Sequence, residues 1–324
     1  MTRAAPLVAA LAFSVAGCAG SPPLADGLSP AAPRSIELGA TPYFPQQDFQ
    51  CGPAALATLL VASGVEVTSD ALTPQVYIPG RRGSLQAELV GAARRHGRLP
   101  YVLASTADEM IAELVAGRPV LVLQNLGAMR LPRWHYAVLI GYDAGKNVAI
   151  LRSGRKERLE MRWQRFAGTW HRGGRWAITT LEPGLIPPHA DPDRYVEAVA
   201  GLEAAGKLEA AAASYDAALA RWPQSSHAWL GRGNVAYGQG DLPAAASAYA
   251  RAIELAPGDA APRNNLAQVL ADANCIAEAR RQSARAEELA AGTPLAATVG
   301  ELRAKLATAS AEAACSLTGR LWPD

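Results

Sequence analysis

The stretch Tyr43-Phe-Pro-Gln-Gln-Asp-Phe-Gln-Cys-Gly-Pro-Ala-Ala-Leu56 decides how the first half of this chain folds, and Cys51 lies near its centre. Before the cysteine the segment is polar and contains a proline, which favours a turn. After it, Gly52 and Pro53 lead into a run of helix formers that continues to Gly64. Proline is tolerated in the first helical turn, and glycine commonly follows the last one. We therefore predict that Cys51 lies at or just before the N-terminus of a helix.

That position favours an ionised thiol. The N-terminus of a helix carries unpaired N–H groups and the positive end of the helix dipole, and both stabilise a thiolate. The alternative is a structural cysteine, since free cysteines are among the most buried residues. The residues around Cys51 are polar, glycine or proline rather than apolar, and the other three cysteines can be assigned elsewhere. We interpret Cys51 as a nucleophile.

The first residues of the chain have the pattern of an export signal. Arg3 precedes a mostly apolar run, which is too short to span a bilayer, and Val15-Ala-Gly-Cys18 follows it. The tetrapeptide resembles a bacterial lipobox, which implies a signal peptide over residues 1–17 and lipidation of Cys18. Because Ala19 rather than aspartate follows, the resemblance implies an outer-membrane lipoprotein that faces the periplasm and contacts the membrane only through its lipid. The alternative is ordinary cleavage after Ala19.

Length and composition set the number of domains but exclude little. A chain of 324 residues with 50% hydrophobic content suggests about two domains. The net charge of +2 gives no reason to expect a nucleic-acid partner. We find no phosphate-binding loop and no Cys/His cluster with metal-ligand spacing, so we expect no cofactor and no metal. We predict a tether over 18–35, a first domain over 36–183, a linker over 184–192 and a second domain over 193–324.

The first domain has helical patterns first and strand patterns later. Beyond the Cys51 helix, we expect a helix over residues 84–94 capped by Ser84, and another over 110–115 behind the capping box Thr106-Ala-Asp-Glu109. Strands are expected at four short β-branched or aromatic runs: 119–124, 135–142, 147–151 and 175–181. This order predicts an α+β fold.

His135 begins the second of these strands and is the only one of five histidines in a strand-like run. A turn over residues 143–146 would pair Tyr142 with Asn147 and place His135 opposite residues 152–154. A lone histidine on a strand is more often structural than catalytic. Opposite a cysteine at a helix N-terminus, however, an imidazole can take the thiol proton while the thiolate attacks a carbonyl.

These residues together carry a family resemblance. Pro45 to Leu56, with Gln-Cys-Gly-Pro at its centre, and His135-Tyr-Ala-Val-Leu-Ile-Gly-Tyr-Asp143 resemble the C39 family of papain-like cysteine peptidases over residues 41–181. The resemblance implies a papain-like α+β fold, with Cys51 as nucleophile and His135 as general base. The best-known members trim double-glycine leader peptides within ABC exporters. This sequence shows no exporter domain, so that substrate is not carried over.

Two positions depart from the family pattern. The family glutamine that stabilises the oxyanion usually lies six residues before the cysteine, where this chain has Pro45. Gln46 is the nearest candidate, and Gln47 is the second. The family also orients its histidine with an aspartate on the following strand. Ser153 is the only neutral side-chain acceptor in that stretch here, and we expect it to contact His135 as a weak substitute for the carboxylate.

The second domain repeats with a period of 34 residues, which is the period of tetratricopeptide repeats. The matching pairs are Gly206 and Gly240, Tyr215 and Tyr249, Ala218 and Ala252, and Pro223 and Pro257. The preceding repeat is looser, and the following one has Ser283 where an aromatic residue belongs. We expect an all-α tetratricopeptide-repeat domain closed by a capping helix over residues 295–314. Such arrays usually bind peptides or proteins on the concave face, so we expect a protein partner there.

Cys275 and Cys315 are predicted to form a disulfide. An exported chain meets an oxidising compartment, and lipidation of Cys18 leaves three cysteines. Cys275 precedes a helix that we expect to run antiparallel to the capping helix, and their lengths bring both cysteines to the same end. The disulfide would leave Cys51 as the free thiol.

The sequence therefore predicts a lipid-anchored cysteine peptidase that cleaves a peptide or protein substrate and docks a partner on its repeats. Two alternatives stay open. The same thiol chemistry serves papain-like acyl transferases and deamidases, and only the products would separate them. The missing carboxylate near Ser153 instead favours a non-catalytic scaffold that binds peptides.

Overall fold

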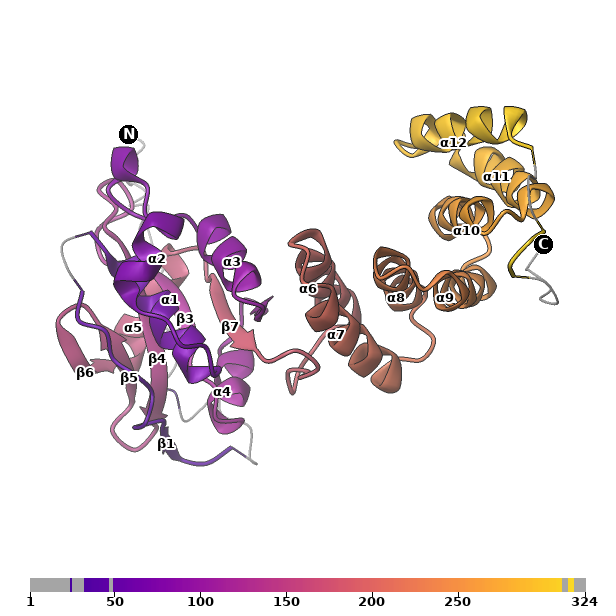
Figure 1. The fold of residues 1–324 in the computed structure, drawn as a ribbon. Coiled ribbons are helices and arrows are strands. Elements are labelled where there is room, and N and C mark those ends of the chain that lie inside the picture. The colour runs from indigo at the N-terminus through magenta and orange to yellow at the C-terminus, as the bar shows by residue number, and fades with distance from the viewer. Residues whose placement is uncertain (1–23, 25–31, 47–48, 311–313, 318–324) are drawn as a thin grey trace, which may run out of the picture.

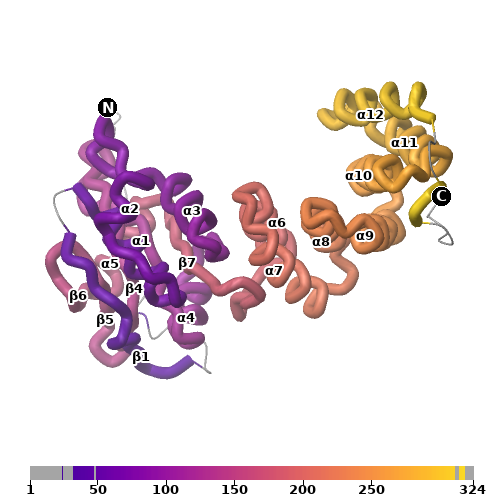
Figure 2. The backbone as a smooth tube through the Cα atoms, in the orientation of Figure 1, coloured from indigo at the N-terminus to yellow at the C-terminus, as the bar shows by residue number. Residues whose placement is uncertain are grey.

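The computed structural model describes residues 24, 32–46, 49–310 and 314–317. The predicted signal peptide, Cys18 and Gln47 lie outside these residues. The described residues form an antiparallel sheet flanked by helices, followed by a row of helices that curves away from it (Figure 1). The tube in Figure 2 follows the same path from one part to the other. The predicted class, α+β followed by all-α, is confirmed.

A seven-stranded antiparallel sheet organises the first domain. Its order is β2-β7-β3-β4-β5-β6. Strand β1 pairs with residues 141–143 of β4, beyond the residues of β4 that pair with β3. The strands are β1 (Ser35–Glu37), β2 (Leu99–Val102), β3 (Val120–Asn125), β4 (Trp134–Asp143), β5 (Val148–Ser153), β6 (Lys156–Arg162) and β7 (Ala177–Leu181). The four predicted strands are β3, β4, β5 and β7. The sequence analysis missed the other three because β1 and β2 are very short and β6 is highly charged.

Helices cover both faces of this sheet (Figure 1). Helices α1 (Cys51–Ala62), α2 (Ser69–Val76) and α3 (Gln86–Arg95) share one apolar cluster with one face. Helices α4 (Ala107–Val115) and α5 (Trp163–Arg172) pack against the other. Every residue of α1 from Gly52 to Leu60 is buried, and apolar residues surround the helix. A helix of this composition belongs inside a core, so its first residue is held firmly.

Two predicted helix caps are wrong. Helix α3 begins at Gln86, its N-cap is Leu85, and the Ser84 hydroxyl is buried without a hydrogen-bond partner. Thr106 does occupy the N-cap of α4, but its side chain makes no capping bond. Glu109 instead accepts a hydrogen bond from the backbone N–H of Ala104 at 2.5 Å. A different local hydrogen bond, to the N–H two residues before Thr106, therefore replaces the capping box.

The register of the β4–β5 hairpin also differs from the prediction. Tyr142 pairs with Ala149 instead of Asn147, because the turn occupies residues 144–147. A bulge between Leu139 and Gly141 then shifts the pairing by one residue. Gly141 is required at this point, since a Cβ atom there would lie 2.2 Å from the carbonyl oxygen of Ile36 on β1. The bulge and the turn together set which residue of β5 meets the start of β4.

The repeat array consists of three helix pairs and a final helix. They are α6 (Pro192–Ala204), α7 (Leu208–Arg221), α8 (Ser226–Gly238), α9 (Leu242–Leu255), α10 (Ala260–Asp272), α11 (Ile276–Ala290) and α12 (Ala296–Thr308). Equivalent helices begin 34 residues apart, for example at 192, 226 and 260. Small residues admit the aromatic rings of the neighbouring helix: a Cβ on Gly231 would lie 2.1 Å from the Tyr215 ring, and one on Gly233 would lie 2.5 Å from Tyr249.

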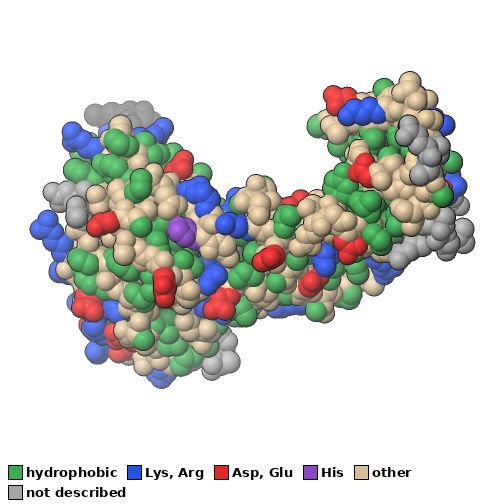
Figure 3. Space-filling model, viewed as in Figure 1, with side chains coloured by type: hydrophobic (Ala, Val, Ile, Leu, Met, Phe, Trp, Pro, Cys, Tyr) green, Lys and Arg blue, Asp and Glu red, His purple; other side chains and the backbone are tan. Residues whose placement is uncertain are grey.

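The array is packed directly against the first domain. Residues of α6 and α7 belong to the same apolar cluster as β2, and the Asp191 N–H donates to the Tyr101 hydroxyl at 3.1 Å. Arg194 on α6 forms an ion pair with Glu109 on α4 at 3.0 Å. Figure 3 shows that the curved array leaves the molecule hollowed between its two ends. Buried apolar contacts across a junction restrict relative motion of the two domains.

The predicted disulfide between Cys275 and Cys315 is present, with the two Cα atoms 4.5 Å apart. Helix α12 ends earlier than predicted, at Thr308, and residues 311–313 lie outside the described part of the chain. The Ser316 N–H donates to the Ala273 carbonyl at 3.0 Å, so the segment around Cys315 lies against the end of α10. Within the described ranges, no helix combines the length and the apolar character needed to cross a bilayer.

Candidate active site

Cys51 is the first residue of α1, as predicted, and its side chain is half-buried. Burial raises the pKa of the Cys51 thiol, because a thiolate is less stable away from water. Hydrogen bonds from the backbone N–H groups of Tyr136, Gly52 and Cys51 itself act in the opposite direction, but the net shift of the pKa is upward. This direction is opposite to the one expected for a resting thiolate: burial outweighs the helix terminus and favours the neutral thiol.

Close packing fixes the start of α1. A Cβ atom on Gly52 would lie 2.3 Å from the Ser84 hydroxyl oxygen, so only glycine fits there. The Tyr136 hydroxyl donates to the Ser84 carbonyl at 3.2 Å, which ties β4 to the same loop. The first turn of α1 is thus held between β4 and the segment before α3. Such fixed positions are what a reactive side chain needs.

His135 is the second residue of β4 and is half-buried. The Tyr136 N–H that reaches the thiol belongs to the peptide group joining His135 to Tyr136, so the structure brings Cys51 and His135 to the same end of β4. Burial, and to a lesser extent the positive charge of Arg133, lowers the pKa of His135 to about 4. The imidazole is neutral at pH 7. A neutral imidazole is the form that can accept a proton.

Ser153 contacts His135, as predicted. Its Oγ lies 2.8 Å from His135 Nε2, at the end of β5. When Nε2 carries the ring hydrogen and donates it to Ser153, the lone pair of the neutral ring lies on Nδ1. Ser153 can therefore hold the orientation of the ring, but a hydroxyl both donates and accepts, so it does not fix the tautomer as a carboxylate would. Being uncharged, it cannot stabilise an imidazolium to the same extent.

Gln46 lies beside this pair through its backbone. The Gln46 N–H donates to the Gly154 carbonyl at 3.3 Å, and the Tyr43 hydroxyl donates to the same oxygen at 3.2 Å. Arg152 anchors the segment further, since its guanidinium donates to the carbonyl oxygens of residues 39 and 41. Gly154 directly follows Ser153. The backbone of Gln46, the predicted oxyanion donor, is thus bonded to the residue that follows Ser153, the partner of His135.

The sequence analysis missed Gln124, which is the cross-strand partner of His135 on β3. Side chains of directly opposed residues lie next to one another. Gln124 is fully buried, and its Nε2 donates to Thr169 Oγ1 on α5 at 2.7 Å. Its Oε1 has no hydrogen-bond partner among the described residues. A polar residue at the end of the apolar run of β3 was the signal that could have identified it.

Exposed apolar side chains lie close to Cys51 and His135 along the chain. Phe49 lies two residues before the cysteine and is 56% exposed, whereas Trp134 directly precedes the histidine and is 58% exposed. Met129 and Leu131, in the loop between β3 and β4, are more exposed still. Asn125 holds this loop, because its Oδ1 accepts hydrogen bonds from two N–H groups of residues 127 and 133. The segments on either side of the site therefore expose apolar surface to the solvent.

The chemistry of the site is that of a thiol and an imidazole. Across the described residues, His, Cys, Asp and Glu side chains do not gather in groups of three or more that could hold a metal ion. Cys51, His135 and Ser153 come from α1, β4 and β5. This arrangement can transfer a proton from sulfur to nitrogen and attack an electrophilic carbon.

Residues 39–178 match the model of the Peptidase_C39 like family, and residues 201–260 match the tetratricopeptide repeat. Similar solved structures include a C39-like peptidase from Bacillus anthracis, with 18% identity and a TM-score of 0.39 over 46% of this chain and 98% of that one. The peptidase domain of Streptococcus ComA, a bifunctional ABC transporter, shows 22% identity and a TM-score of 0.35 over 44% and 98%.

For the repeats, the translocator chaperone SycD of Yersinia enterocolitica shows 20% identity and a TM-score of 0.34 over 36% of this chain and 82% of that one. No curated protein matches the chain significantly. The family matches carry the assignment, because these TM-scores all lie below 0.5. The first domain is C39-like, and the helices that follow it match tetratricopeptide repeats.

Proposed function

We propose that the first domain is a cysteine peptidase, with Cys51 as the nucleophile and His135 as the general base. The observation that carries this proposal is the position of the thiol, at the N-terminus of α1 and against the peptide that follows His135. Ser153 binds the far nitrogen of the imidazole. A buried structural cysteine would need none of these neighbours.

The reaction begins from a neutral thiol and a neutral imidazole. His135 Nδ1 takes the thiol proton as the sulfur of Cys51 attacks the substrate carbonyl carbon, and the Nε2–H continues to donate to Ser153. The carbonyl oxygen gains the negative charge. It accepts hydrogen bonds from the Cys51 N–H and, in this proposal, from the Gln46 side-chain amide. The imidazolium then gives its proton to the leaving amine, and water hydrolyses the thioester with His135 again as base.

The two pKa shifts make the first step harder than in a preformed ion pair. Burial raises the pKa of Cys51 and lowers that of His135, so proton transfer in the empty site is unfavourable. The negative charge must therefore be stabilised after it has moved to the substrate oxygen, where preorganised N–H donors act. We expect slow turnover on short peptides and dependence on a bound substrate that excludes water.

One observation favours a second candidate, a C39-like domain that binds peptides without cleaving them. Ser153 is neutral where the family places a carboxylate, and it leaves the imidazolium without a counter-charge. The exposed apolar side chains near the site would serve binding equally well. Product analysis separates the two candidates, and it also separates hydrolysis from acyl transfer to an amine and from deamidation.

The test is a cleavage assay with a proteome-derived peptide library, read by mass spectrometry. The unmodified protein should produce new N-termini that disappear in Cys51→Ala and His135→Ala. Ser283→Ala is the matched control, because this buried residue lies in the repeat array and away from the site. An intact library after long incubation, with peptides still bound, would establish the non-catalytic candidate. Products in which an acyl group has been joined to a new amine would establish a transferase, and conversion of a side-chain amide to a carboxylate with release of ammonia would establish a deamidase.

We further propose that the repeats dock a protein partner and that Cys18 is lipidated, which would hold the protein at the outer membrane facing the periplasm. The repeat match supports the first statement, and the Val15-Ala-Gly-Cys18 motif supports the second. Metabolic labelling with a palmitate analogue tests the anchor. Label that persists in Cys18→Ser would refute it.

A further inference from the structure

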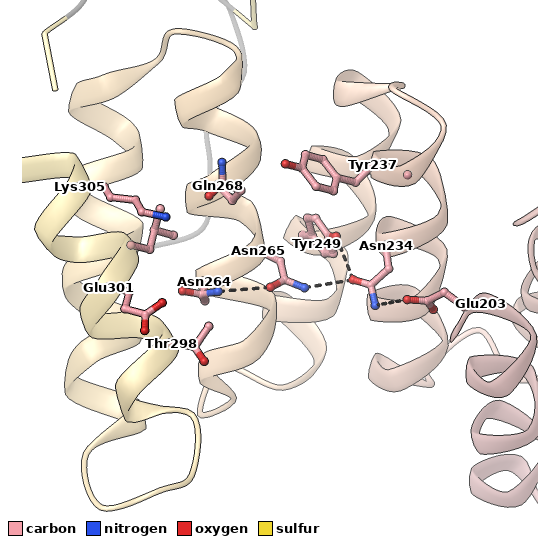
Figure 4. Close-up of a pocket in the computed structure, with 12 residues that line it drawn as sticks. Glu203, Asn234, Tyr237, Tyr249, Asn264, Asn265, Gln268, Thr298, Glu301 and Lys305 are labelled. Carbon is pink, nitrogen blue, oxygen red and sulfur yellow. Dashed lines mark hydrogen bonds between the residues drawn. The ribbon is translucent and has the colours of Figure 1, made fainter. Parts of the chain in front are cut away.

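The inner face of the repeat array contains a cavity of about 440 Å³ (Figure 4). Helices α6, α8, α9, α10 and α12 contribute its lining. Most lining side chains are amides, hydroxyls or carboxylates, and Lys305 is the one basic residue among the described residues that line it. The polarity of these groups decides which ligand the cavity can take.

A chain of hydrogen bonds crosses the floor of the cavity, and a carboxylate sets its direction (Figure 4). Glu203 accepts from Tyr215 at 3.2 Å and from Asn234 Nδ2 at 3.1 Å. Asn234 Oδ1 therefore points onward and accepts from Asn265 Nδ2 at 3.0 Å. Asn265 Oδ1 in turn accepts from Asn264 Nδ2 at 3.4 Å. An ionised carboxylate can only accept, so each amide must turn its N–H toward it.

The last amide of this chain is left with an unused acceptor. Asn264 is 8% exposed, and its Oδ1 has no hydrogen-bond partner among the described residues. In Figure 4 this oxygen points away from Asn265, toward the side of the cavity where Thr298 and Glu301 stand. Buried polar atoms in proteins are nearly always paired. An unpaired acceptor in a cavity wall is therefore a position that a ligand's donor can fill.

A second carboxylate uses up the donors at the other end of the cavity. Asp272 accepts from the Tyr237 hydroxyl at 2.7 Å and from Gln268 Nε2 at 2.9 Å. Donors of the lining are thus engaged with carboxylates or with the Asn234 and Asn265 carbonyl oxygens, whereas Asn264 Oδ1 accepts no hydrogen bond from the described residues. Glu301 forms no ion pair within the described residues, although Lys305 stands four residues further along α12. The cavity presents acceptors and net negative charge.

We propose that this cavity binds an arginine side chain of a partner peptide. This inference rests on the proposed docking role of the repeats and names the chemistry of the partner. Guanidinium carries five N–H donors and no acceptor, which complements a wall of acceptors and carboxylates. The Tyr237 ring is 38% exposed at the cavity edge and can stack on the planar group. An acidic or neutral side chain would leave these acceptors unpaired.

The experiment measures fluorescence anisotropy of three labelled peptides, (Gly-Ser-Arg)4, (Gly-Ser-Gln)4 and (Gly-Ser-Glu)4. The full chain carries Cys51→Ala so that no peptide is consumed. The arginine peptide should bind at least ~10-fold more tightly than the glutamine peptide, since hydrogen bonds to charged groups are the stronger ones. Glu301→Gln should weaken arginine binding by about tenfold. The control Glu254→Gln makes the same change at an exposed residue of α9, outside the cavity.

Lys305→Gln removes the one positive charge of the lining and should tighten binding of the arginine peptide. Equal binding of the arginine and glutamine peptides, a preference for the glutamate peptide, or no binding of the arginine peptide would each overturn the proposal. Thermal unfolding confirms that Glu301→Gln folds. The same substitution in the chain with an intact Cys51 should leave cleavage of a short peptide unchanged. A chain that still cleaves a short peptide but does not bind the arginine peptide would therefore reject this inference and leave the proposed peptidase untouched.

Discussion

Replacing Ser153 by aspartate should raise the pKa of His135 and speed catalysis. The Ser153 hydroxyl lies 2.8 Å from His135 Nε2, so a carboxylate at this position would reach the same nitrogen. Asparagine has nearly the same shape as aspartate but carries no charge, and Ser153→Asn is therefore the matched control. The comparison isolates the charge that the family pattern provides and this chain lacks.

The magnitude follows from the environment of the imidazole. Burial and Arg133 lower its pKa from 6.5 to about 4, which corresponds to roughly 3 kcal/mol in favour of the neutral form. A carboxylate in direct contact typically shifts a pKa by about 1–3 pH units toward the charged form. We therefore expect the pKa of His135 in Ser153→Asp to lie between about 5 and 7. A base with a pKa nearer to neutral pH takes the thiol proton more readily, so turnover should rise.

The assay is a proton NMR titration of the imidazole signals between pH 3.5 and 8.5, with His135→Gln to assign the resonance. The pH dependence of the free energy of unfolding gives a second measurement of the same pKa. Because the native pKa is lowered, the unfolded state binds a proton first. The free energy of unfolding should therefore decrease by up to about 3 kcal/mol as the pH falls from 6.5 to 4. His135→Gln should abolish this part of the pH dependence.

Two results would refute the reasoning. If His135 titrates near 6.5 in the unmodified protein, burial does not control it and the neutral starting state is wrong. If the aspartate and asparagine variants share one pKa, Ser153 does not contact the imidazole in solution. A pKa that rises without any gain in turnover would instead favour the non-catalytic candidate.

Three further predictions concern the cysteines and the oxyanion. Because burial raises the pKa of Cys51, alkylation by iodoacetamide should reach half its maximal rate above pH 8.5, and rapid alkylation below pH 7 would contradict the neutral thiol. Gln46→Ala should reduce turnover by about a hundred- to a thousandfold. If only Gln47→Ala causes this loss, the oxyanion donor is Gln47 and not Gln46. The Cys275–Cys315 disulfide closes a loop of 40 residues, so its reduction should destabilise the repeat array by about 4 kcal/mol. Urea unfolding of the last helices measures this change. An unchanged unfolding midpoint would show that the disulfide does not stabilise the array.

The disulfide also explains why the last repeat tolerates a weak pattern. Ser283 replaces the aromatic residue of the other repeats and is fully buried, so α11 lacks the ring that fills the space between helices in its neighbours. The bond between Cys275 and Cys315 holds the end of the chain against this pair. Arg280 adds hydrogen bonds to the carbonyl oxygens at the end of α12. A covalent link and a charged cap thus replace apolar packing at the terminus of the array.

The sequence by itself determined the parts of this protein that depend on local pattern. Gly52 and Pro53 place a helix start at Cys51, apolar runs mark four strands, and the 34-residue period marks the helix pairs. The expected hairpin placed the stretch of Ser153 opposite His135, and the family pattern gave this residue its role. The pairing of Cys275 with Cys315 followed from the cysteine count, the expected oxidising compartment and the expected helix lengths together, although α12 ends earlier than predicted.

Only the tertiary structure decided the register and the protonation states. The turn over residues 144–147 and the bulge near Gly141 set the pairing of β4, and the bulge depends on β1, which is distant in sequence. Gln124 became a neighbour of His135 through strand pairing. The helix terminus favours a thiolate at Cys51, yet burial by surrounding elements outweighs it. Desolvation depends on every atom packed around a group, and no local stretch of sequence contains that sum.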